Sequence, residues 1–305
     1  MKRKYNINKK LLEKMYIQNK FSCRKIAEEL KITSSETIRY WLRKYKIKRR
    51  TLSESRTKYV KISFSREMKE KAYLLGLRVG DIHARMNHNM VRVECGTSHS
   101  SQLKMFRMTF GEYSHVHVYL NMHQEFFEWD MYCDLDKSFD FLLIKPLKIP
   151  SWILEKDELF FSFLAGYADC ESSCDMRKSN KNNIRFTFRL RTSDFEILKQ
   201  IRNKLNENEI HTTLNLDKPK GKKTNLGKHN KDFWCLAVQR KADVLKLSAL
   251  LLKNSKHDEK IRKMNLMSKY FKEKHWSKAV NEVMKMRKII NSETLDSLRN
   301  LEFGV

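Results

Sequence analysis

Two apolar stretches decide how this chain is organised: Leu74-Leu75-Gly76-Leu77-Arg78-Val79-Gly80-Asp81 and Leu164-Ala165-Gly166-Tyr167-Ala168-Asp169-Cys170-Glu171-Ser172. Each has two small residues four positions apart, and an acid follows the second of them directly. Residues four apart share one face of an α-helix, so each stretch predicts a helix with a smooth strip on which another backbone can pack closely. If the two helices pack on these strips, Asp81 and Glu171 emerge side by side.

The two stretches open two copies of a loose internal repeat of about 90 residues. Between positions 184 and 191, four apolar residues alternate with three arginines and a threonine. This alternation predicts a strand with an apolar back that packs on helices and an open front that faces a ligand, for which the arginines favour a nucleic acid. In the first copy we expect strands around 91–95, 115–120 and 126–132 and a helix over 98–110; in the second, strands over 184–191, 212–216 and 233–240 and helices over 193–206, 242–252 and 258–271.

The chain is strongly basic, with a formal net charge of +27 at pH 7. Residues 1–60 carry 19 Lys and Arg against 5 Asp and Glu, and residues 151–305 carry 32 against 20, whereas residues 61–150 are almost neutral with 12 against 11. Basic surfaces of this size indicate a polyphosphate partner, because neutralised phosphates release condensed counterions. A lysine-rich solvated surface is the alternative that composition alone leaves open.

Residues 8–48 are predicted to form a compact helical unit, with Ser22 and Ser34 or Ser35 placed to cap helices. Its last helix, over 35–45, has apolar residues on one face and Arg39 and Arg43 on the other. The arrangement resembles the helix-turn-helix of resolvase-like and sigma-like DNA-binding domains, which implies that this helix enters the major groove. A basic three-helix bundle with a protein partner, or with none, is the alternative.

No Cys-x-x-Cys pair occurs among the six cysteines, and no apolar run approaches the ~20 residues of a membrane span. The N-terminus is basic and lacks the apolar run of a signal peptide. We therefore expect a soluble, intracellular protein, in the cytoplasm, the nucleoid or an organelle matrix, with free thiols and no membrane partner.

The paired stretches resemble the LAGLIDADG, or DOD-type, motif of homing endonucleases, and the resemblance covers about residues 66–271. It implies an α+β fold of two pseudo-symmetric αββαββα repeats, whose saddle-shaped antiparallel sheets lie in the major groove on either side of the cut. It also implies a monomer that cuts both strands of a long, partly asymmetric duplex in intron homing. The expected organisation is a helix-turn-helix domain over 1–50, a linker over 51–65, repeats over 66–150 and 151–271, and a helical tail of unassigned role over 272–305.

The resemblance carries site residues over by position. The eighth motif residues, Asp81 and Glu171, are the expected ligands of Mg²⁺, for which Mn²⁺ can substitute, because hard cations prefer oxygen ligands. Gly76, Gly80, Gly166 and Cys170 fall on the interface between the motif helices. Lys260, Arg262 and Lys263 are the nearest counterparts of basic residues that assist at the scissile phosphate, and Lys260 and Lys263 join the two acids as candidate catalytic residues. The candidate DNA contacts are Arg39, Arg43, Arg92, His115, Arg185, Thr187, Arg189 and Arg191.

Departures from the motif leave alternatives open. Val79 stands where the consensus has a sixth-position acid, while the second motif keeps Asp169. A DNA-binding regulator that does not cleave, or an intron RNA maturase, could use the same scaffold. His83 and His88 are predicted to lie in a hairpin rather than to act as bases, and Ser172 and Ser173 to cap or turn the chain rather than to act as nucleophiles. For the aromatic residues Phe126, Phe127, Trp129 and Tyr132, packing in the core is favoured over base stacking.

Overall fold

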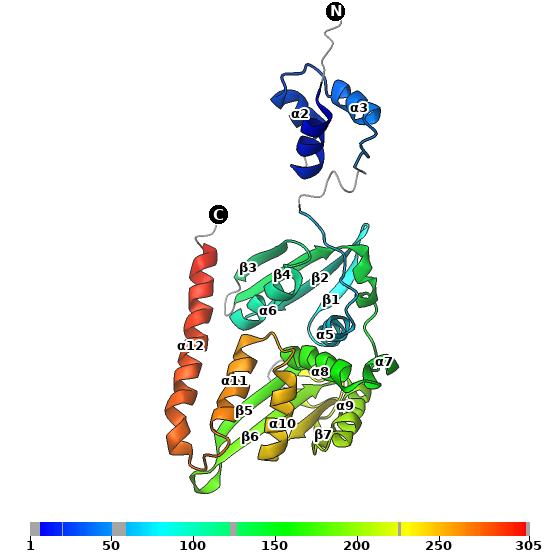
Figure 1. The fold of residues 1–305 in the computed structure, drawn as a ribbon. Helices are drawn as coiled ribbons and strands as arrows, with labels where there is room; N and C mark the ends of the chain where they lie inside the picture. Colours follow the sequence, from blue (N-terminus) through cyan, green and yellow to red (C-terminus); the bar gives the residue numbers. More distant parts are fainter. Residues whose placement is uncertain (1–6, 20, 51–58, 123–126, 225–226, 303–305) are drawn as a thin grey trace, which may run out of the picture. The chain divides into compact units, whose positions relative to one another are not determined.

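The computed structural model describes residues 7–19, 21–50, 59–122, 127–224 and 227–302. It divides the chain into two units, residues 1–60 and 61–305 (Figure 1). The expected linker over 51–65 lies outside the described residues from 51 to 58. Its last part belongs to the second unit, because Phe64 is buried against the rings of Phe139 and Phe141.

The first unit is a small helical bundle with its own apolar core, which includes Leu12, Ile26, Ile38 and Leu42. The predicted caps are present: the hydroxyl of Ser22 accepts from the backbone N–H of Lys25 at 3.1 Å, and that of Ser34 accepts from Glu36 at 3.2 Å. Its elements are α1 (Lys9–Glu13), the π-helical turn η1 (Lys14–Gln18), α2 (Cys23–Glu29) and α3 (Ser35–Lys44).

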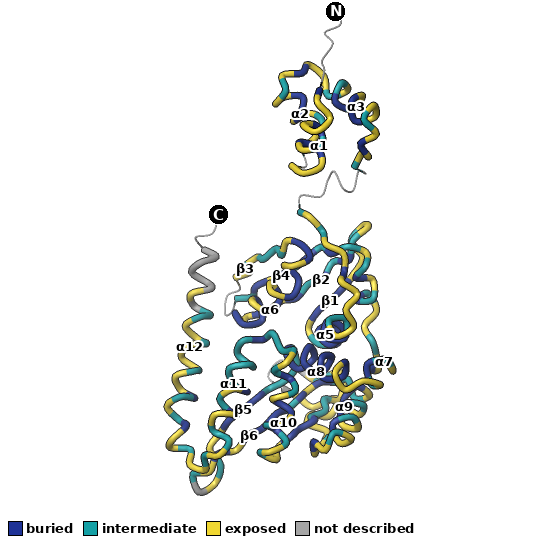
Figure 2. The backbone as a smooth tube through the Cα atoms, viewed as in Figure 1, coloured by how far each residue is buried: buried dark blue, intermediate teal, exposed yellow. Residues whose placement is uncertain are grey.

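The second unit is built on two adjacent helices, α5 (Met68–Val79) and α8 (Asp157–Glu171), which contain the two motif stretches. Every residue from Leu159 to Asp169 is buried (Figure 2). A helix that is apolar on all sides is stable only inside a core, and α8 has α5, α7 (Ser151–Leu154), α10 (Lys241–Leu251) and the strands of the second sheet around it.

Each motif helix leads into a four-stranded antiparallel sheet, and the two sheets share one strand order. Sheet A follows α5 in the order β1-β2-β4-β3, and sheet B follows α8 in the order β5-β6-β10-β7. The repeat predicted from sequence is therefore present in the topology. Sheet A contains β1 (His83–Asn87), β2 (Met90–Thr97), β3 (Val116–Met122) and β4 (Phe127–Leu135); sheet B contains β5 (Ser172–Lys178), β6 (Ile184–Thr192), β7 (Thr213–Lys218) and β10 (Phe233–Val238).

Helices contact the apolar face of each sheet, and the polar face stays open. The strands of sheet A bury side chains such as Val93 and Met131, whereas Arg92 and Tyr132 are on the opposite face. The fold is α+β, with each sheet flanked by helices, as the sequence predicted. The remaining elements are α6 (Ser100–Phe110), η2 (Lys137–Leu142), η3 (Asn180–Asn182), α9 (Phe195–Glu207), β8 (Lys223–Thr224), β9 (Gly227–Lys228) and α11 (Asp258–Lys269).

The tail is the long helix α12 (Trp276–Glu302), which runs beside α11 and reaches α6 (Figure 1). The carboxylate of Glu293 accepts from Arg262 of α11 at 2.8 Å and from Lys104 of α6 at 3.2 Å. One acid of α12 therefore connects a helix of the second repeat to a helix of the first. Over the described residues, no helix has the length and apolar character that a membrane crossing requires.

Of the aromatic residues of β4 expected in the core, some pack there and one lies on the open face. Trp129 is fully buried, and Phe127 packs edge-on against it, whereas Tyr132 is on the open face and stacks on His117. Phe126 lies outside the described residues. His83 is the first residue of β1, and His88 is exposed in the turn before β2, where its φ is 54°.

Candidate active site

The two motif acids stand at equivalent ends of α5 and α8. Asp81 comes directly after Gly80, which caps α5, and Glu171 is the last residue of α8. A Cβ atom on Gly76 would collide with the carbonyl oxygen of Phe163, and one on Gly166 would collide with that of Tyr73. Glycine is therefore required where the helix backbones meet, and this contact brings the two helix ends together.

The second pair of small residues continues this contact toward the acids. A Cβ atom on Gly80 would overlap the Cβ of Cys170, whose thiol contacts the carbonyl oxygen of Leu77 at 3.9 Å. The structure thus places all four small motif residues between α5 and α8.

The surroundings of Glu171 disfavour the ionised form of its carboxyl group. Burial raises its pKa to about 7, and the negative charges of Asp81 and Asp194 add to the effect, while Lys145 and Lys260 oppose it. Asp81 itself is exposed. A cation bound next to Glu171 would offset the burial and the negative charges that disfavour its ionised form.

Sequence reasoning missed Gln102, which holds Asp81 in place. Its side-chain nitrogen donates to Asp81 Oδ2 at 3.0 Å, and its oxygen accepts from the hydroxyl of Thr97 at 3.1 Å. Gln102 is buried, where polar groups need hydrogen-bond partners, and both ends of its amide have one inside the protein. The signal available in the sequence was a polar residue one turn before the apolar residues Met105 and Phe106 of the same helix.

Lys260, expected near the scissile phosphate, is partly buried against the last turn of α8. Its ammonium donates to the carbonyl oxygens of Ala168 and Asp169 at 2.6 Å each and of Cys170 at 3.0 Å. Carbonyls of a last helical turn have no partner within the helix, and a cation there also interacts favourably with the helix dipole. Burial lowers the pKa of Lys260. Its position fits that of a residue that fixes the backbone just before Glu171.

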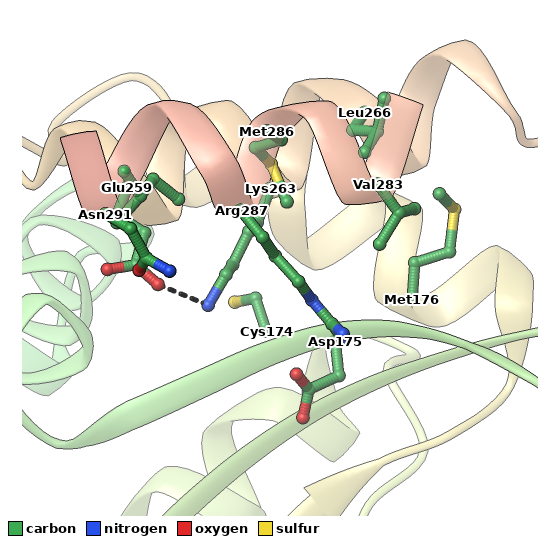
Figure 3. A pocket seen from close by; sticks show the side chains of 11 residues that line it. Cys174, Asp175, Met176, Glu259, Lys263, Leu266, Val283, Met286, Arg287 and Asn291 are labelled. Atoms are coloured by element: carbon green, nitrogen blue, oxygen red, sulfur yellow. Dashed lines mark ion pairs between the residues drawn. The ribbon is translucent and has the colours of Figure 1, made fainter. Parts of the chain in front are cut away.

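Lys263 and Arg262 form ion pairs with acids other than Asp81 and Glu171. The ammonium of Lys263 pairs with Glu259 at 2.5 Å beside a cavity of about 230 Å³ between β5, α11 and α12 (Figure 3). Arg262 pairs with Asp258 at 2.6 Å and with Glu293. Both side chains are thus paired with acids of α11 or α12.

Lys145 is a second residue that the sequence did not single out. It lies between the repeats, 3.7 Å from Asp194, and its charge lowers the pKa of Glu171. Lys145 is exposed, unlike Lys260, and is therefore the more accessible of the two cations that act on Glu171.

The sixth motif position has a structural role in the second repeat. Asp169 is 2% exposed, and it accepts from the hydroxyl of Tyr73 at 2.7 Å, from the backbone N–H of Lys256 at 2.8 Å and from the hydroxyl of Ser255. Burial raises its pKa. In the first repeat Val79 is fully buried, so the lost acid is replaced by core packing.

Asp81 and Glu171 are the two motif carboxylates at the helix ends. Within the described residues, no group of three or more His, Cys, Asp or Glu side chains is arranged to hold one. Mg²⁺ is commonly bound by one or two carboxylates together with water and substrate phosphate oxygens. The pair Asp81 and Glu171, in which the charge of Asp81 raises the pKa of Glu171, fits that mode and not a complete protein cage.

The candidate DNA contacts of sheet B are all on its open face, but one of them is buried. Arg185, Arg189 and Arg191 project from β6, where Arg189 is 3.9 Å from Asp175 and Arg191 is 3.5 Å from Asp217. Thr187 is on the same face but is only 3% exposed, and its hydroxyl has no hydrogen-bond partner in the described part of the chain.

The candidate contacts of sheet A are already engaged within the protein. Arg92 forms a bidentate pair with Asp134, with both distances 2.8 Å, and lies over the ring of Tyr132 at 4.0 Å. The ring of exposed His115 is 4.6 Å from that of His117.

In the first unit, Arg39 of α3 pairs with Glu36, and Arg43 is exposed on the same helix.

Solved structures similar in fold to this chain include homing endonucleases. They include the homing endonuclease I-WcaI bound to its DNA recognition sequence, with 16% identity, 62% of this chain and 81% of that one covered, and a TM-score of 0.43. I-GzeII, a LAGLIDADG homing endonuclease in complex with its DNA target, is 11% identical over 73% of this chain and 96% of that one, with a TM-score of 0.42. I-SmaMI bound to its uncleaved DNA target in the presence of calcium ions is 10% identical over 77% of this chain and 98% of that one, with a TM-score of 0.40. No family model matches the chain, and no curated protein matches it in sequence.

These likenesses are partial and at low identity, and they concern the fold alone. The repeat itself stands on the strand order of the two sheets and on the packing of α5 against α8.

Proposed function

We propose that the chain is a divalent-metal-dependent endonuclease that hydrolyses phosphodiester bonds in both strands of a long DNA duplex. The observation that carries the proposal is the placement of Asp81 and Glu171 at equivalent ends of two helices packed through glycine. Two acids, each at the end of the helix that leads into one sheet, suit a substrate with two strands, and both copies lie in one chain, so a monomer suffices.

The chain's own residues prepare the site. Asp81 and Glu171 are the proposed ligands, and Mg²⁺, when bound, supplies an activated water and stabilises the leaving oxygen. Gln102 holds the Asp81 carboxylate from the side of α6. Lys260 holds the last turn of α8 and so positions Glu171. Lys145 is the proposed exposed cation on the phosphate side of the site.

DNA binding in the proposal involves both units. The arginine face of sheet B contacts the duplex next to the cut, and the basic first unit binds as a helix-turn-helix through α3. Exposed Arg43 on α3 supports that role. The order α2, turn, α3 with capped helices supports it as well.

The test is a search for metal-dependent breaks in a large pool of DNA. The purified chain is incubated with fragmented genomic DNA that lacks its gene, with Mg²⁺ or with a chelator, and the new ends are sequenced. We expect paired, staggered ends at one site or a few sites with Mg²⁺ only. Asp81→Asn and Glu171→Gln should abolish the ends while DNA binding persists, and Asp140→Asn, at an exposed acid of η2, should not.

Two other results would reject cleavage. DNA binding without new ends in Mg²⁺ or Mn²⁺ would point to a regulator that does not cut. Tight binding of structured RNA together with weak duplex binding would point to a maturase.

A further inference from the structure

The open faces of the two sheets carry opposite charge. On sheet A the strand register places two arginines and four acids on the open face: Arg85, Arg92, Glu94, Glu128, Asp130 and Asp134. On sheet B the same construction gives four arginines and two acids: Arg177, Arg185, Arg189, Arg191, Asp175 and Asp217.

The difference arises at equivalent positions of the repeat. Glu94 of β2 pairs with His83 of β1, and Arg189 of β6 pairs with Ser173 of β5, so Glu94 stands where the second repeat has an arginine. The next open-face positions along these strands are Gly96 and Arg191. The two sheets have the same strand order, but at this equivalent position sheet A has a negative charge and sheet B a positive one.

The cations of sheet A are neutralised inside the protein. Arg85 donates to Glu94 at 3.2 Å, and Arg92 is held by Asp134 through two hydrogen bonds. Glu128 and Asp130 lie over Gly96 and form no ion pair within the described residues. The face that continues from Asp81 is therefore acidic, and it repels phosphate.

Sheet B, in contrast, is extended by a basic hairpin between β7 and β10. Its exposed lysines contribute a second set of positive charges beyond Arg185 and Arg191. Thr187, buried on this face with an unsatisfied hydroxyl, adds a hydrogen-bonding group that has no partner in the described protein. The exposed hairpin lysines are Lys218, Lys220, Lys222, Lys223, Lys228 and Lys231.

A DNA duplex is uniformly charged along both halves of a target, so two faces of opposite sign cannot bind it alike. From this asymmetry, and resting on the proposed function, we infer that the second unit anchors the duplex by its phosphates through sheet B and its hairpin, while sheet A makes no net phosphate contact. Affinity and its salt dependence then come from the second repeat and the first unit. Sheet A meets the duplex at a cost in repulsion, which lowers the binding of DNA in general.

The test uses the full chain and a 40-base-pair duplex of arbitrary sequence with a chelator present, so that it does not depend on cleavage. Binding is measured by fluorescence anisotropy over a series of salt concentrations. Each phosphate contact contributes roughly 0.9 to the slope of log affinity against log salt. Arg185→Gln with Arg191→Gln should therefore weaken binding and reduce the slope by roughly 2.

Two matched variants make the inference specific. Arg85→Gln on sheet A should leave the slope unchanged, and Glu128→Gln with Asp130→Asn should strengthen binding severalfold at low salt, because repulsion is removed. Lys220→Gln with Lys222→Gln alters exposed hairpin lysines and should repeat the sheet B result even if the arginine variant folds poorly.

A reduced slope for Arg85→Gln, or weaker binding for Glu128→Gln with Asp130→Asn, would overturn the inference and leave the proposed endonuclease standing. Normal salt slopes in both sheet B variants would overturn it as well. Failure of the wild-type chain to bind any duplex would reject the inference and the proposed function together.

Discussion

Gln102 of α6 donates a hydrogen bond of 3.0 Å to the carboxylate of Asp81 across the end of sheet A. Glu171, in contrast, accepts no hydrogen bond of this kind among the described residues, and its surroundings are the charges of Asp194, Lys145 and Lys260. The two acids therefore occupy one position of the repeat but are held by different means.

Gln102→Leu tests whether that hydrogen bond orients Asp81 for catalysis. A hydrogen bond to a charged group contributes about 1.5–3 kcal/mol, so losing it should slow cleavage by about 10- to 100-fold if it acts in the transition state. DNA affinity measured with a chelator should not change. The measurement is single-turnover cleavage of the mapped target, and Gln200→Leu on α9 serves as the control. A wild-type rate in Gln102→Leu would show that Asp81 is held well enough without it.

Lys260 and Lys263 were equivalent candidates by sequence, and the structure predicts unlike results for them. Lys260→Met removes a donor shared by three carbonyl oxygens, of which only that of Ala168 keeps another donor among the described residues, in Ser172, so it should lower the free energy of unfolding by about 2 kcal/mol. Lys263→Met removes a partly exposed i,i+4 pair with Glu259 and should cost less than about 1 kcal/mol. Urea unfolding of both variants gives the comparison. Equal stability of the two would contradict the capping role of Lys260.

The sequence predicted well those parts of the molecule that depend on local pattern. The alternation from Ile184 to Arg191 is strand β6, and the spacing of Gly76 and Gly166 matches a contact between helix backbones. These features follow from period and residue size, which are visible along a single chain.

Tertiary pairing decided what the sequence could not show. Arg92 is a basic residue on an open face in any one-dimensional pattern, but Asp134, distant in sequence, binds it. Lys260 follows the second sheet as expected, yet its ammonium is bound by the carbonyls that end α8. The role of Gln102 is visible only in the folded protein, where its position on α6 lets it donate to Asp81.

Glu171 predicts a pH dependence of stability in the absence of metal. Its pKa is raised to about 7 in the folded protein, whereas a glutamate in an unfolded chain titrates near 4.3. The folded state binds this proton more tightly, so the stabilisation is complete below about pH 4 and is lost as the pH rises through 7. The loss is on the order of 3 to 4 kcal/mol.

Glu171→Gln removes this titration and serves as the comparison. With a chelator present, the wild-type free energy of unfolding should fall relative to that of Glu171→Gln between pH 5 and pH 8, because only the wild type must ionise a half-buried acid. Glu196→Gln, at an exposed position on α9, should follow the wild type. Parallel curves for the wild type and Glu171→Gln would contradict a raised pKa.

The first unit predicts a contribution to DNA affinity that is separate from cleavage. Arg39 and Arg43 lie on α3 away from its buried residues, and in a helix-turn-helix this helix enters the major groove. Arg39→Gln with Arg43→Gln should weaken duplex binding and reduce the salt slope by roughly 1 to 2, because up to two phosphate or base contacts are lost. The rate of cleavage at saturating protein should stay at the wild-type value, since α3 is not part of the site at Asp81 and Glu171. Lys9→Gln with Lys10→Gln, at two exposed positions of α1, is the matched control for removal of charge alone, and a loss of affinity as large in that variant would assign the effect to net charge and not to α3.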